Sequence, residues 1–223
     1  MLRRALLIAL IALVTVPIAA QTPGWKVRLD GSAAVTAFDA NPGLTILPTE
    51  KGLHLTGGPA AIIYDPSNTA KPIYRVKATF TQLKKADTNA YYGIFFGGNN
   101  MDSAMPEYVY FAISQDGSFI IRHRLGDKVD EMDKSLHYAI KKPDASGKAV
   151  NVLDVQVAPT GVSYVVNGAV VDATPTRSAI AGNSFTTLEK IGGIVGVRID
   201  APNDVQVDNI LVESPFQLND RGQ

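Results

Sequence analysis

The amino-acid sequence predicts an all-β protein, folded as an antiparallel β-sandwich. Apolar residues alternate with polar residues over short runs, and turn residues separate these runs. After residue 20, no segment keeps helical spacing for more than about two turns. About a dozen short strands spaced in this way are typical of a sandwich or a barrel.

Twelve segments alternate strongly enough to be predicted as strands. They are Lys26 to Leu29, Leu53 to Thr56, Ala61 to Tyr64, Ile73 to Thr81, Tyr91 to Phe96, Tyr108 to Ser114, Ser118 to Arg124, Val150 to Ala158, Val162 to Val166, Ala169 to Asp172, Gly193 to Ile199 and Val205 to Val212. A short helix is predicted within Ser178 to Lys190.

The N-terminus has the pattern of a secretory signal peptide. Arg3 and Arg4 precede an apolar run too short to span a bilayer comfortably, and Ala20 supplies the small residue before the cut. We therefore expect residues 1–20 to be removed, residues 21–215 to form one sandwich domain and residues 216–223 to be a polar tail. The expected location is the bacterial periplasm or the medium, with no membrane attachment after cleavage.

Composition excludes several classes of protein. The chain has no cysteine, so it has no disulfide, lipidated cysteine or thiol nucleophile. Without residues 1–20 it carries 19 basic and 21 acidic side chains, a net charge of −2. A protein that binds the phosphate backbone of nucleic acid concentrates positive charge instead, so no nucleic-acid partner is expected.

Two hairpins can be predicted from their turns. Asn167-Gly168 between two apolar strands is typical of a two-residue type I′ turn, in which both residues need positive φ. The second hairpin turns at Gln115-Asp116-Gly117. A two-residue turn would place Phe111 opposite Arg122, whereas a three-residue loop with Gly117 in a bulge places Tyr110 there and sorts apolar from polar faces. We predict the second register.

That register predicts a polar face on the second hairpin. Tyr108 and Tyr110 would lie opposite Arg124 and Arg122, with His123 at the margin of the core. Sugar rings stack on aromatic side chains and accept hydrogen bonds from guanidinium groups, so these four residues and Tyr92 are the candidate ligand-binding set. A cross-strand ladder without any ligand explains the same pattern, and both interpretations stay open.

Two further points about this face remain to be decided. Alternation alone does not decide whether Tyr91 or Tyr92 points to the core. The strand Ile73 to Thr81 also alternates, and its polar side, from Arg75 to Thr81, is expected to extend the same surface.

Several segments carry a family resemblance. They are Tyr92 to Gly98, Tyr108 to Asp127, Asn151 to Val155, Val165 to Gly168, Gly193 to Arg198 and Val207 to Ile210. Together they resemble the concanavalin A-like lectin/glucanase superfamily, and more narrowly the laminin-G-like and 3-keto-disaccharide hydrolase-like modules of exported bacterial proteins. The resemblance implies a jelly roll of two curved sheets whose concave face often holds sugar.

Catalytic and metal-binding motifs are incomplete. The glucanase branch uses Glu-x-Asp-x-x-Glu, but Glu131-Met132-Asp133 is followed by Leu136 where the last acid belongs, in a stretch that looks like a loop or an edge strand. Asp127, Asp130, Glu131 and Asp133 match no defined calcium loop. Three scattered histidines lack metal-ligand spacing, and no Gly-x-Ser-x-Gly occurs. We predict no catalytic residue, no metal and no cofactor.

Three functional hypotheses follow. The first is an exported, non-catalytic module that either recognises an oligosaccharide or polysaccharide or serves in cell-envelope adhesion, with the concave face as its site. The second is a glycan-active enzyme of the keto-sugar hydrolase or lyase type, which would bring a carboxylate such as Glu107 or Asp133 beside the tyrosines and arginines. The third is a structural interaction domain.

Overall fold

The computed structural model describes residues 24–32, 35–37, 43–175, 191–200 and 202–214. The predicted signal peptide, the predicted helix within residues 178–190 and the polar tail lie outside the described residues. Within them, no helix is long and apolar enough to cross a bilayer.

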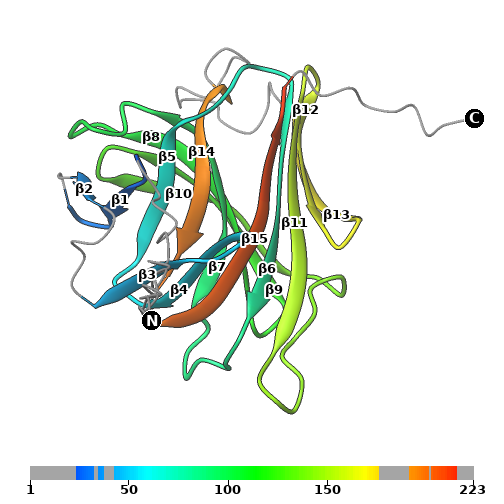
Figure 1. Ribbon diagram of the computed structural model, residues 1–223. Coiled ribbons are helices and arrows are strands. Elements are labelled where there is room, and N and C mark those ends of the chain that lie inside the picture. Colours follow the sequence, from blue (N-terminus) through cyan, green and yellow to red (C-terminus); the bar gives the residue numbers. More distant parts are fainter. Residues whose placement is uncertain (1–23, 33–34, 38–42, 176–190, 201, 215–223) are drawn as a thin grey trace, which may run out of the picture.

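The described strands form two antiparallel sheets packed face to face, as the fold class predicts (Figure 1). The eight-stranded sheet has the order β10-β9-β8-β7-β14-β5-β1-β2, and the seven-stranded sheet the order β13-β12-β11-β6-β15-β4-β3. The strands are β1 (Lys26–Leu29), β2 (Val35–Ala37), β3 (Leu44–Pro48), β4 (Gly52–Gly57), β5 (Ala61–Ala70), β6 (Tyr74–Gln82), β7 (Tyr91–Asn99), β8 (Glu107–Ser114), β9 (Ser118–Leu125), β10 (Lys128–Leu136), β11 (Ala149–Ala158), β12 (Gly161–Val166), β13 (Ala169–Pro175), β14 (Gly193–Ile199) and β15 (Asn203–Glu213).

All twelve predicted strands are present, and nine of them are one to six residues longer than predicted. The strands β2 and β3 were not predicted. The polar stretch expected to be a loop or an edge strand is β10, which lies at the edge of the eight-stranded sheet. An edge strand has one neighbour and a solvated side, so it can be strongly polar and still pair.

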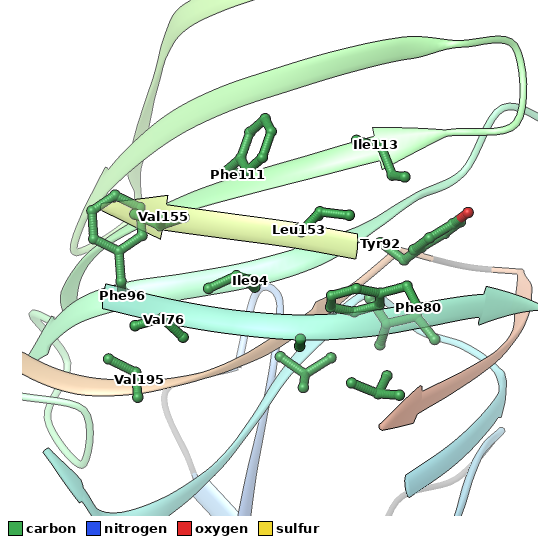
Figure 2. Close-up of a cluster of buried hydrophobic side chains, with 14 of the residues drawn as sticks. Val76, Phe80, Tyr92, Ile94, Phe96, Phe111, Ile113, Leu153, Val155 and Val195 are labelled. Atoms are coloured by element: carbon green, nitrogen blue, oxygen red, sulfur yellow. The ribbon is translucent and has the colours of Figure 1, made fainter. Parts of the chain in front are cut away.

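The core fills the space between the two sheets. Side chains from the eight-stranded sheet, such as Ile94, Phe96 and Val195, meet Phe80 and Leu153 from the seven-stranded sheet (Figure 2). All of these are buried. Because every second residue of a strand faces this core, the intervening residues must face outward.

Both predicted hairpin turns are confirmed. Asn167 and Gly168 have φ of 52° and 86°, as a type I′ turn needs, and Val166 pairs with Ala169. The other hairpin has the three-residue loop, with Gly117 at φ 89°. Tyr110 consequently pairs with Arg122.

The expectation for the strand Ile73 to Thr81 was wrong. It forms β6, which belongs to the seven-stranded sheet, so its polar side faces away from the polar face of the hairpin. There Arg75 forms an ion pair with Asp154, with a nitrogen–oxygen separation of 2.5 Å. Alternation within a strand cannot say to which sheet the strand belongs.

His123 lies at the margin of the core, as predicted, and is only 1% exposed. Its Nε2 is 3.4 Å from a carboxylate oxygen of Glu107. Burial lowers the pKa of His123, because the imidazolium form loses its hydration, and this outweighs the opposite effects of Glu107 and Asp130.

The lowered pKa of His123 predicts a pH-dependent stability. The unfolded chain binds the proton below about pH 6.5, whereas the folded chain resists it, so the free energy of unfolding should fall as the pH drops below that value. Urea denaturation at pH 7.5 and 5.5 should show a smaller loss for His123→Gln than for the wild type. An NMR titration in which the His123 ring protonates at or above pH 6.5 would contradict this.

Candidate functional site

The candidate site lies on the outer face of the eight-stranded sheet, the face turned away from the other sheet. The hairpin of β8 and β9 places Tyr108 opposite Arg124 and Tyr110 opposite Arg122, in the predicted register. Both tyrosines belong to a second apolar cluster that is separate from the core between the sheets. Four of the five candidate residues therefore share one face.

Tyr92, the fifth candidate, is not on this face. Its side chain points into the core, is 2% exposed and lies 5.8 Å from the Phe80 ring, measured between ring centroids (Figure 2). Burial raises the pKa of Tyr92 to about 12. Its neighbour Tyr91 takes the outer position, where its hydroxyl lies 2.9 Å from the Ser118 hydroxyl. The prediction for Tyr92 was wrong because parity alone did not fix which tyrosine faces outward.

Aromatic rings form a continuous row across the outer face. Tyr64 on β5 meets Phe95 on β7 at a centroid distance of 5.9 Å, although β14 lies between their strands. They can meet because Gly196 occupies β14 at that point, and a Cβ there would be 2.6 Å from the Phe95 ring. Phe95 in turn packs on Tyr108 at 5.7 Å, and Tyr108 on Tyr110 at 6.3 Å.

Arg198 is the centre of the polar contacts on this face, and the candidate set did not include it. It is 3% exposed. Its guanidinium donates to both carboxylate oxygens of Asp30 at 2.7 Å and to Asp200 at 2.9 Å. The same group lies 4.7 Å from the centroid of the Tyr110 ring. Between them lies β7, where Gly93 pairs with Arg198.

The charge of Arg198 is held in place by its partners. Burial alone would lower the pKa of Arg198, but the hydrogen bonds to Asp30 and the charges of Asp200 and Asp30 outweigh burial and raise it. A buried guanidinium is tolerated when its donors are all directed at such acceptors. Arg198 is therefore a permanently charged group fixed under the polar surface.

The contacts continue from Tyr110 to the edge of the sheet. Arg122 lies opposite Tyr110 in the β8–β9 register and donates to Glu131 on β10 at 2.8 and 3.2 Å. One set of neighbouring side chains thus draws on β8, β9, β10 and β14 and on the segments that follow β1 and β14. We call it the charged row, and it consists of Glu131, Arg122, Tyr110, Arg198, Asp30 and Asp200.

Two further buried arginines, Arg124 and Arg28, lie on this face, and Arg124 contacts the charged row through Asp30. Arg124 is 7% exposed, donates to the carbonyl oxygen of Gly126 at 2.8 Å and lies 3.3 Å from Asp30. Arg28 is 3% exposed and donates to the carbonyl oxygens of Met101 and Ser103, both at 2.9 Å. The bonds from Arg28 hold the segment after β7 against the outer face.

The exposed parts of the face are not those expected. Tyr108 and Tyr110 are 1% and 3% exposed, so their rings do not form an open stacking platform. The side chains of Glu131, Asp30 and Arg122 are 43%, 35% and 33% exposed. The accessible surface of the site therefore consists of carboxylates and one guanidinium, supported by buried aromatic rings.

The carboxylates expected beside an enzyme site lie elsewhere. Glu107 contacts His123 at the core margin, and Asp133 pairs in register with Ile121, whose side chain faces the core. The carboxylates of the charged row are Asp30, Asp200 and Glu131, and each binds an arginine. Asp102 also lies on this face, where it accepts from the Tyr64 hydroxyl and forms an ion pair with Lys26. Within the described ranges, no three His, Asp or Glu side chains converge as a metal site would require.

Two solved structures resemble the whole sandwich. The carbohydrate-binding module CBM66 from Bacillus subtilis matches with a TM-score of 0.57 and 11% identity, over 86% of this chain and 96% of that one. A protein of unknown function with a galectin-like fold, from the same organism, matches with a TM-score of 0.57 and 12% identity, over 84% and 88%. At this level of identity the likeness establishes the fold, a galectin-like sandwich of the concanavalin A-like class.

Comparisons of sequence give no further relative. No family model matches the chain, and no curated protein matches it.

Asp30 forms ion pairs with both Arg198 and Arg124, so its substitution should cost more stability than substitution of an aspartate in a surface ion pair. Asp30→Asn should lower the free energy of unfolding by about 2 kcal/mol, because Arg198 and Arg124 both lose a charged acceptor. Asp102→Asn should cost less than about 1 kcal/mol, since its side chain is 65% exposed in a surface ion pair with Lys26. Urea denaturation of the two variants measures both losses, and equal losses would contradict the role of Asp30.

Proposed function

We propose that this chain is a carbohydrate-recognising module of an exported protein, which binds an oligosaccharide or polysaccharide without modifying it. The charged row on the outer face is the observation that carries the proposal. The fold shared with a carbohydrate-binding module supports it.

The chemistry of the row suits sugar hydroxyl groups. A hydroxyl both donates and accepts, so neighbouring hydroxyls are bound well where a carboxylate lies next to a guanidinium. Arg122 and Glu131 provide this combination on β9 and β10, and Asp30 provides a further half-exposed carboxylate. Because ion pairs already hold these side chains, little conformational entropy would be lost on binding.

The glycan-active enzyme is the alternative. A hydrolase or lyase of the 3-keto-disaccharide hydrolase-like type would need an acid or base free to transfer a proton to the sugar. The three carboxylates of the charged row are each engaged by an arginine, and Asp102 on the same face is engaged by Lys26 and Tyr64. This arrangement favours binding over proton transfer. A laminin-G-like interaction domain without a sugar ligand is the remaining alternative.

The proposal includes the route of export. The N-terminal pattern supports cleavage after Ala20 and a periplasmic or secreted mature chain that begins at Gln21.

A glycan-binding screen on the mature chain, with and without calcium, tests this function. Arg122→Ala and Glu131→Gln should each weaken binding at least about tenfold, a loss of roughly 1.4 kcal/mol per variant. Arg75→Ala is the matched control, because Arg75 forms a comparable ion pair on the other sheet. It should bind like the wild type.

Two outcomes would overturn the proposal. No binding of any glycan by the folded wild type would favour the interaction domain. Release of free sugar from a bound glycan would favour the enzyme.

A further inference from the structure

A pocket of about 250 Å³ lies beside the charged row, and none of its lining residues belongs to that row. It is formed by the end of β4, the segment between β6 and β7, and the start of β15. Its lining includes Thr56, Lys84, Lys85, Asp87, Asn203 and Asp204. Pockets for drug-sized ligands measure about 300–1,000 Å³, so this one suits a single ring and not a chain.

One side of the pocket carries a fixed carboxylate. Oδ1 of Asp204 lies 2.7 Å from Nε2 of His54, and the Thr56 hydroxyl lies 3.2 Å from the same nitrogen. These three side chains come from neighbouring strands, since β4 and β15 pair directly. Asp204 and Thr56 thus present hydroxyl-binding oxygens in a set geometry.

The segment between β6 and β7 contributes two lysines to the lining. Lys84 and Lys85 are exposed, and within the described part of the chain neither ammonium group has a carboxylate within 4 Å. Both positive charges are therefore available to a ligand. Because Asp87 and Asp204 line the same pocket, a singly charged anion fits the balance of charge better than a doubly charged phosphate.

The segment that carries the lysines is held in place by two glutamines. Gln115 accepts from the Ala86 amide at 3.0 Å and donates to the carbonyl oxygens of Ala86 and Thr88 at 2.8 and 2.9 Å. Gln82, which is 1% exposed, donates to the carbonyl oxygen of Lys84 at 3.0 Å. The pocket is thereby formed before any ligand arrives, which reduces the entropy lost on binding.

The pocket is also connected to the outer face. The Asn203 side chain donates to the carbonyl oxygen of Asp200 at 2.9 Å, and the carboxylate of Asp200 accepts from Arg198. Asn203 also donates to the carbonyl oxygen of Tyr91, at 3.3 Å. A site here lies beside the charged row without sharing its ligand-binding side chains.

We propose that this pocket is a second sugar subsite, selective for a single ring that bears a carboxylate, as in a uronic acid. The inference rests on the proposed carbohydrate recognition. Lys84 and Lys85 bind the carboxylate of the sugar, and Asp204 and Thr56 bind its ring hydroxyls. The subsite extends recognition from the charged row to acidic glycans.

NMR titration of the ¹⁵N-labelled mature protein tests the subsite. Galacturonic acid and glucuronic acid are the probes. Galactose and glucose are the matched controls, which carry a hydroxymethyl group in place of the carboxylate. At least one uronic acid should shift the backbone amides of residues 84–88 and 203–204 in a saturable way. Its matched neutral sugar should bind at least tenfold more weakly.

Variants establish which residues carry the binding. The double variant Lys84→Ala/Lys85→Ala should lower the affinity for the uronic acid at least tenfold, and the remaining binding should not depend on salt concentration. Lys51→Ala is the control, because Lys51 is an exposed lysine at the other end of β4 and should leave binding unchanged. Binding that survives in the double variant would overturn the inference, as would equal binding of neutral and acidic sugars.

The same titration separates this inference from the proposed function. Shifts confined to Tyr110, Arg122 and their neighbours would overturn the subsite and support the charged row. Shifts in the pocket that persist in Arg122→Ala, together with a glycan screen that is indifferent to Arg122, would support the subsite and overturn the role of the row. If no sugar shifts any amide and no glycan binds in the screen, both the subsite and the proposed function are overturned.

Discussion

The outer face depends on one buried guanidinium, that of Arg198. A charge with so little exposure must be matched by acceptors, and Asp30 and Asp200 match it while the Tyr110 ring covers one side. This requirement fixes the end of β1, the end of β14 and the strand β8 relative to one another. Gly93 has a separate cause, because a Cβ at that point of β7 would collide with the backbone of β8 at Phe111 and Ala112.

The proposed function depends on what the buried layer leaves accessible. The aromatic rings and Arg198 are buried, so they act as a rigid support. The exposed side chains of the charged row are Glu131, Arg122 and Asp30. A support of this kind orients polar side chains precisely enough to distinguish neighbouring hydroxyl groups. The pocket beside it uses the same strategy, with glutamines in place of ion pairs.

The sequence predicted local features well and long-range ones poorly. The twelve strands predicted from alternation are all present, and the turn at Gly117 correctly placed Tyr110 opposite Arg122. Both predictions depend only on residues that are close together in the chain. Arg198 and Asp30 are 168 residues apart, and only the order of strands brings them together. The sequence does not reveal the order of strands, and for the same reason the polar side of β6 was predicted on the wrong face. Alternation around Val195 and Val197 could still have placed Arg198 outward.

The most direct test of the central claim is hydrogen–deuterium exchange of the mature protein with and without the glycan that binds it most tightly. The account predicts slower exchange on binding in peptides that cover residues 107–125 and 193–199, the strands that carry the charged row. Protection confined to residues 149–166 and 206–213, on the other sheet, would contradict the assignment of the outer face as the recognition surface.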